Sequence, residues 1–300
     1  MQLPRRSDID TMRLSGIPDD VVQELGPLVM GCLLAYLLQG VLIVQICIYL
    51  SHPRYSSDVL PLKVTVWLVC VIELVCTMFV TAAAWVYPVK GWGDPDVLRQ
   101  PTWTVAFAQV PNSIVALVVQ LFFCCRMFLL NHRGLVPGFI GMAACVPVVM
   151  AVVGGIKSVK LPDVALEYRI MPYIVTTYGG SALCDIMIAL NNIRLLYTIK
   201  KGSVFPDTQS LLMRNIKICM HTGIVTACFS IVHVATFLAM PSRTLHWVFL
   251  FIAEKIYSNT LLAVLNARRK SADCEYETTP SILFGLPVDD LRGAPIDIGA

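Results

Sequence analysis

Residues 245–264 of the chain read LHWVFLFIAEKIYSNTLLAV, an apolar stretch that carries two charged residues, Glu254 and Lys255, at its middle. In a helix that rises about 1.5 Å per residue, Lys255 lies roughly 15 Å from the start of this stretch, near the centre of a bilayer. Each ionisable group at that depth costs about 2.5–3.5 kcal/mol on insertion scales. We therefore expect this helix to face other helices rather than lipid.

The composition of the chain excludes an ordinary soluble domain. Of its 300 residues, 56% are hydrophobic and 14% are charged, whereas about 25% of the residues in soluble domains are charged. The net charge is only +3 and the basic residues are scattered, so no nucleic-acid partner is expected. Ten of the eleven cysteines lie in apolar segments, where Cys acts as a small buried hydrophobe, and no disulfide framework is predicted. The partner that the composition predicts is the lipid bilayer.

The predicted fold is all-α, a polytopic membrane bundle of seven transmembrane helices. The seven apolar segments cover residues 25–50, 62–87, 103–130, 135–156, 172–198, 216–239 and 245–264, and a crossing helix needs about 20 residues. Pro111 should kink the third segment, and Pro147 interrupts the fourth. We expect a polar head over residues 1–24, a seven-helix transmembrane domain over residues 25–269, and a disordered tail over residues 270–300, where apolar residues are sparse.

The distribution of basic residues predicts the orientation. With seven spans, twelve Lys and Arg residues close to the membrane lie on the side of the tail, and nine lie on the side of the head. Since basic loops stay in the cytosol, the tail is expected there, with the head outside or lumenal. The predicted loop over residues 200–217 is the most basic connection, and it is a candidate docking segment for a cytosolic partner. The chain is thus predicted to be an integral protein of the plasma membrane or of an endomembrane.

Polar side chains inside the spans define a candidate intramembrane cluster. Glu254 and Lys255 project about 100° apart on a helix, so they cannot neutralise each other, and each needs a partner on another helix. Glu73 lies at the depth of Lys255, whereas Asp185 is expected nearer the cytosolic end, so Glu73 is the predicted partner of Lys255. The cluster is either an ion, proton or ligand site or a structural set of helix contacts, and it contains Glu73, Asp185, Thr226, His233, Glu254, Lys255 and Asn259.

Two polar stripes accompany this cluster. Lys255, Asn259 and Asn266 share one face of the last span, and residues 222, 226, 230 and 233 share one face of the sixth. Helices in a membrane bundle satisfy such side chains with each other. We expect the two stripes to face each other across the bundle.

The residue pattern predicts neither a metal site nor an enzyme. A zinc site needs three or four convergent ligands, and His233 has no second His four residues away and no Cys-x-x-Cys pair to join it. His221, His233 and Asp185 do not form a recognisable catalytic set. A retinal cofactor on Lys255 is not expected either, because Phe251 stands four residues before it, where retinal proteins carry an aspartate. No cofactor is therefore predicted.

Short motifs occur along the apolar part of the chain, namely Leu25-Gly26-Pro27-Leu28, Gln45-x-x-x-Tyr49, Asp185, His221-Thr222-Gly223, Met240-Pro241 and Lys255-x-Tyr257-x-Asn259-x-Leu261-Leu262-Ala263-x-Leu265-Asn266-Ala267-Arg268. In this order they resemble a large family of basidiomycete fungal membrane proteins whose domain is labelled only as of unknown function. The resemblance covers about residues 25–269, and it implies a seven-helix membrane protein without an established activity. His221 departs from the family, where an Asn often stands.

Two functional hypotheses follow from these features. The first is a receptor-like or sensor bundle, because seven spans, an outer head and short outer loops leave a small-molecule ligand only the bundle interior. The alternative is a small-solute or proton transporter that uses the buried charges. Inverted repeats and broken half-helices, which are typical of carriers, are not evident in the sequence.

The predicted topology can be tested with protease-cleavable tags. A tag before Met12 should be cleaved from the outer or lumenal side, and a tag after Asn266 only from the cytosol, because an odd number of spans separates them. Cleavage of both tags from one side of sealed vesicles would rule out seven spans.

Overall fold

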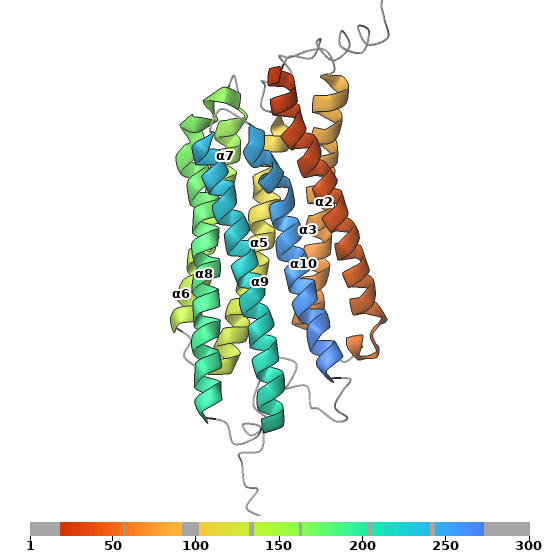
Figure 1. Cartoon of the computed structure of the whole chain (residues 1–300), viewed down its shortest axis with the longest axis vertical. Coiled ribbons are helices and arrows are strands. Elements are labelled where there is room, and N and C mark those ends of the chain that lie inside the picture. The colour runs from red at the N-terminus through yellow and green to blue at the C-terminus, as the bar shows by residue number, and fades with distance from the viewer. Residues whose placement is uncertain are drawn as a thin grey trace, which may run out of the picture.

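The computed structural model describes residues 19–56, 58–91, 102–131, 135–161, 164–202, 206–240 and 244–272, and within these ranges the chain forms helices and no strands. The α-helices are long and antiparallel, and short helical turns join or extend several of them (Figure 1). The α-helices are α2 (Asp19–Ser51), α3 (Leu60–Trp85), α5 (Trp103–Asn131), α6 (Leu135–Ala143), α7 (Cys145–Ser158), α8 (Met171–Gly202), α9 (Pro206–Ala239) and α10 (Trp247–Ala272). The short turns are η1 (Pro53–Tyr55), η2 (Val86–Lys90), η3 (Val164–Ile170) and η4 (Thr244–His246).

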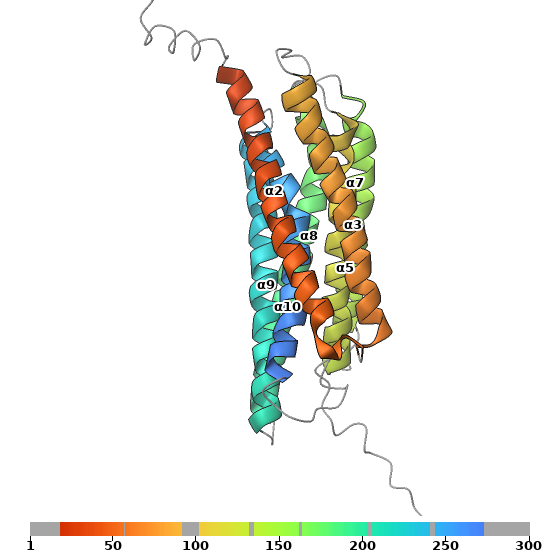
Figure 2. The ribbon, with the colours of Figure 1, turned by 90° about the vertical axis from the view of Figure 1, so that its right-hand side faces the viewer.

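The helices form a closed ring in the order of the sequence. Each helix packs against its neighbour in the sequence, and α10 closes the ring against α2. Helix α10 also contacts α3 and α5, and α5 also contacts α8, so α5 and α10 occupy the middle of the bundle. Figures 1 and 2 show α2 beginning at the same end as α10, while α10 ends at the opposite end.

Six helical segments are long and apolar enough to cross a membrane: Leu25–Ser51, Leu60–Lys90, Trp103–Leu129, Leu135–Ser158, Tyr168–Arg194 and Thr244–Ala267. Helix α9 contributes a shorter apolar segment, Gly223–Ala239. The predicted all-helical fold is thus confirmed among the described residues, and six of the seven predicted spans have the length and the hydropathy of a membrane span; the seventh is not confirmed.

The distribution of side chains is the inverse of that in a soluble protein. Large apolar side chains such as Leu37, Met78 and Phe139 are exposed on the outside of the bundle, whereas Glu73 and Lys255 are buried within it. Lipid tails solvate apolar side chains, but they offer no hydrogen bonds to polar ones. The polar residues must therefore satisfy one another inside the ring.

Two helix boundaries differ from the sequence prediction. The prediction of a loop over residues 200–217 is wrong, because α8 continues to Gly202 and α9 begins at Pro206. The charges in this stretch exclude it from the bilayer, but a helix can extend beyond the membrane, and Pro206 suits a first helical position. Helix α2 begins at Asp19, within the predicted head. The rest of that head, residues 1–18, and residues 273–300 of the predicted tail lie outside the described residues.

The fourth span is divided as its proline predicts. Helix α6 ends at Ala143 and α7 begins at Cys145. Pro147 has no N–H to donate to the carbonyl of Ala143, which removes one bond of the ladder. Ala144 keeps helical angles, φ −64° and ψ −16°, so the span continues in nearly the same direction. Helix α5, by contrast, runs without a break through Pro111.

Close packing of α2 against α10 rests on Gly31. A Cβ atom there would lie 3.1 Å from the Cα atom of Val248 and 3.1 Å from the ring of Phe251, whereas a Cβ atom at Gly40 meets nothing within 4 Å. Gly31→Leu should therefore push α2 away from α10 and lower the melting temperature in detergent by several degrees. Gly40→Leu, the matched control on the same helix, should leave it nearly unchanged. Equal effects of the two substitutions would contradict this packing.

Candidate functional site

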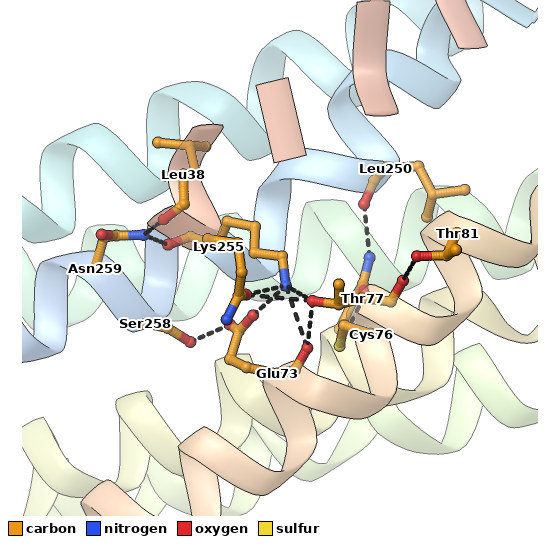
Figure 3. A network of polar contacts seen from close by, with 11 residues as sticks. Leu38, Glu73, Cys76, Thr77, Thr81, Leu250, Lys255, Ser258 and Asn259 are labelled. Atoms are coloured by element: carbon orange, nitrogen blue, oxygen red, sulfur yellow. Dashed lines mark hydrogen bonds and ion pairs between the residues drawn. The ribbon is translucent and has the colours of Figure 1, made fainter. Parts of the chain in front are cut away.

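A buried ion pair joins α3 and α10 at the middle of the bundle (Figure 3). The ammonium nitrogen of Lys255 lies 2.5 Å from Oε2 of Glu73, and both side chains are 1% exposed. The predicted pairing of these two residues is confirmed. The two residues can pair because α3 and α10 run side by side and each carries its charge at the same depth, near the centre of its span.

Three further groups complete the coordination of this ion pair. Lys255 also donates to Oε1 of Gln39 at 2.8 Å and to Oγ1 of Thr77 at 2.9 Å. The second carboxylate oxygen of Glu73 accepts a hydrogen bond from Ser258. The three N–H donors of the ammonium group thus have oxygen partners from α2 and α3. A buried charge pair is stable only with such satisfied neighbours.

On the C-terminal side of Lys255, two amide side chains join α10 to α2. Asn259 donates to the carbonyl of Leu38 at 3.1 Å, and Asn266 donates to the carbonyl of Gln45 at 3.0 Å. The predicted contact between this stripe and the sixth span is therefore wrong, because the stripe faces α2. Side-chain amides can bond to backbone carbonyls that already accept helical bonds, since each carbonyl oxygen has two lone pairs.

A second polar centre surrounds Asp185 on α8. Its Oδ1 accepts a hydrogen bond from Gln120 of α5 at 2.8 Å, and its Oδ2 accepts one from the hydroxyl of Tyr257 of α10 at 2.6 Å. Ser181 bonds to both Gln120 and Tyr257 at 3.1 Å. The groups that donate these hydrogen bonds are neutral amides and hydroxyls. Within the described part of the chain, this centre therefore contains no cation, unlike the ion pair. Its bonds tie the two central helices to α8.

The stripe on α9 faces this second centre and α8. Thr226 is within hydrogen-bonding range of Asp185, and its hydroxyl also donates to the carbonyl of Gly223 at 3.0 Å. The ring of His233 stacks on that of Tyr178, with centroids 3.8 Å apart and planes inclined by 19°. The α9 stripe therefore lies against residues of α8, and not against Lys255.

For Glu254, the structure shows no hydrogen bond from another helix to Oε2 among the described residues, where the sequence predicted a partner. Glu254 is 1% exposed. Its charged neighbours are Lys255 and Glu73 of α3, and Cys76 of α3 and Tyr178 of α8 also lie near it. Adjacent residues project about 100° apart on a helix, so Glu254 does not share the hydrogen bonds that Lys255 makes with Gln39 and Thr77.

The seven predicted site residues are therefore divided among separate groups. Glu73, Lys255 and Asn259 belong to the contacts between α10, α3 and α2. Asp185 and Thr226 belong to the second centre, while Glu254 and His233 lie near Tyr178. No group of three or more His, Cys, Asp and Glu residues that could hold a metal ion occurs among the described residues.

Sequence reasoning missed all three further partners of the ion pair, which are Gln39, Thr77 and Ser258. Thr77 stands four residues after Glu73, and Ser258 stands three residues after Lys255. Residues at these spacings share a helix face, so the signal was present in the sequence. Small hydroxyl side chains are common in membrane helices, however, and the two stood out only after the pairing was known.

Tyr178 and His246 were missed for different reasons. Tyr178 stands seven residues before Asp185, on the same face of α8, which is a readable signal. His246 lies in the short turn η4 before α10, and no periodic pattern marks it. Its centroid is 5.8 Å from that of His233, a proximity that depends on how the helices pack.

The fold and the buried polar centres define an integral membrane protein with several apolar transmembrane helices and a polar interior. A family model described as Family of unknown function (DUF6534) matches residues 181–270. This region includes most of α8, all of α9 and nearly all of α10, and six of the seven predicted site residues. The chain matches no curated protein and no solved structure.

The ion pair predicts strong coupling between its two partners. Lys255→Met or Glu73→Gln alone leaves one buried charge unpaired, which should cost about 3–5 kcal/mol and lower the melting temperature in detergent. The double variant should recover much of that loss, with a coupling energy of about 2 kcal/mol or more.

Lys160→Met is a suitable control for these variants. Lys160 is exposed in the turn after α7, so its replacement should have little effect. Purely additive effects of Lys255→Met and Glu73→Gln would show that the two charges do not depend on each other.

Proposed function

We propose that the protein is a seven-helix receptor-like or sensor bundle of the basidiomycete fungal family that its motifs resemble. Helix α9, with 34 residues, is the proposed seventh crossing. The position of the two described ends at opposite ends of the bundle, as in Figures 1 and 2, supports an odd number of crossings. The distribution of Lys and Arg supports a cytosolic C-terminal end.

The observation that carries this proposal is the set of bonds that α10 makes along its length. The carbonyl of Leu250 accepts a hydrogen bond from Asn112 of α5 at 2.7 Å. Lys255 then binds α3 and α2, Tyr257 binds α8, and Asn266 binds α2 near the other end. A displacement of the outer end of α10 would therefore disturb contacts with four helices down to the opposite end. A sensor needs such an element between its two faces.

The basic segment 200–217 supports a cytosolic partner in this proposal. Its described residues, 200–202 and 206–217, form the end of α8 and the beginning of α9, at the end of the bundle where α10 finishes. Basic helical ends there can bind an acidic surface of a partner. No catalytic role is proposed for the chain.

The alternative, a small-solute or proton transporter, has one favourable observation. Asp185 and Glu254 are buried carboxyl groups on different helices, and such residues form proton relays in transporters. Carriers, however, place their sites at unwound half-helices. The one division of a span among the described residues, at Ala144, keeps helical angles. We therefore favour the receptor-like function.

Proton flux through proteoliposomes distinguishes the two functions. With a pH-sensitive dye in the lumen and an imposed pH gradient, the protein should collapse the gradient no faster than protein-free liposomes do. Asp185→Asn should then have no effect on the rate. Faster collapse that is abolished by Asp185→Asn or by Glu254→Gln would overturn the receptor-like proposal and favour the transporter.

A further inference from the structure

A small cavity lies inside the outer end of the bundle. Its volume is ≈30 Å³. It is bordered by the beginnings of α5, α8 and α10 and by the last parts of α7 and α9. The polar and aromatic residues of its lining are Gln109, Ser158, Tyr178, His233, His246 and Trp247.

Two lining residues carry buried polar atoms without partners. His233 is 1% exposed and Tyr178 is 6% exposed. Nδ1 of His233 and the hydroxyl of Tyr178 have no hydrogen-bond partner among the described residues. Leaving a buried polar group unsatisfied costs about 1–3 kcal/mol. A buried polar group without a protein partner is commonly satisfied by a bound water, ion or ligand, and both residues line the cavity.

The stacked rings hold these groups in fixed positions. The ring of His233 lies on that of Tyr178, and the ring of His246 lies 5.8 Å from His233. Trp247 packs against Tyr87 of the short turn η2, with centroids 5.4 Å apart. A site with rigid aromatic walls and a few polar groups is the usual form of a small-molecule pocket.

The lining sets the size and the charge of the ligand. One water molecule needs about 10–15 Å³ of such space, so the cavity admits a molecule of only a few non-hydrogen atoms. Among the residues that the structure describes, the lining includes no Asp, Glu, Lys or Arg, so these residues give a charged ligand no formal counter-charge. Apolar lining residues such as Val105, Ile174 and Leu250 favour a molecule with an alkyl part.

We propose that this cavity is a binding site for a small uncharged alcohol, whose hydroxyl bonds to His233 and Tyr178 and whose alkyl chain packs on the apolar wall. The site deepens the receptor-like function proposed above and rests on it for its biological meaning. Trp247 stands eight residues, about two helical turns, before Lys255 on the same helix. A ligand that contacts Trp247 would thus act on the helix that carries the ion pair.

The binding can be tested with 2-fluoroethanol as a probe, observed by ¹⁹F NMR, and the protein in lipid nanodiscs. The protein should broaden the probe signal beyond the effect of empty nanodiscs, and excess 1-propanol should reverse this broadening. His233→Phe keeps a ring on Tyr178 but removes the nitrogen, and Ala106→Leu fills the cavity. Both variants should lose at least tenfold in affinity.

Tyr36→Phe is the matched control. It removes an exposed tyrosine hydroxyl on α2, one that donates to Thr81 at 2.9 Å, far from the cavity lining. This variant should bind the probe as the unchanged protein does. Equal binding by Ala106→Leu and the unchanged protein would overturn the site, because the probe would then be bound elsewhere or only by lipid.

His233→Phe provides a second, independent measurement. If the unpartnered nitrogen served no ligand, its removal would raise the melting temperature and leave the probe signal unchanged, and this outcome would also overturn the site. Failure of the proposed alcohol site can be distinguished from failure of the proposed receptor-like function. Probe binding together with Asp185-dependent proton flux would preserve the site and reject the receptor. Absence of both binding and flux would reject the site alone.

Discussion

The structure depends on the need to satisfy one buried ammonium group inside a bilayer. Lys255 has no water to solvate it, and it is bonded instead to Glu73, Gln39 and Thr77. These bonds fix the rotation of α10, because a turn of the helix would move the ammonium group into lipid or into an apolar contact. They also fix the depth of α3 relative to α10. The arrangement of α2, α3 and α10 therefore follows from a single charge.

The ion pair fixes the arrangement of α2, α3 and α10, and the second polar centre fixes the position of α8 relative to α5 and α10. Tyr257 and Gln120 hold Asp185, and so α10 and α5 are joined to α8. Lys255 and Tyr257, the α10 residues of the two centres, are only two residues apart, yet Lys255 contacts α2 and α3 whereas Tyr257 contacts α8. One central helix thus determines the position of most of the ring. This arrangement suits a protein in which a change at one face must be transmitted to the other.

Some features do not contribute to this stabilisation. Glu254 is buried with an unpartnered oxygen, and Tyr178 and His233 also keep unpartnered polar atoms. Folding alone would favour their replacement by apolar residues. Tyr178 and His233 line the cavity at the end of the bundle where α10 begins, and the interior of the bundle departs there from what stability requires. Such departures are expected at functional sites.

The sequence by itself determined the all-helical membrane fold, since long apolar segments in lipid must satisfy their backbone as helices. It also predicted the pairing of Lys255 with Glu73, because two charges at one depth in a medium without water have few other choices. Only the tertiary structure decided which faces meet. Asn259 faces α2 rather than α9, and His233 stacks on Tyr178, because helix rotation and neighbour choice depend on the packing of the whole ring, which the period of one helix cannot specify.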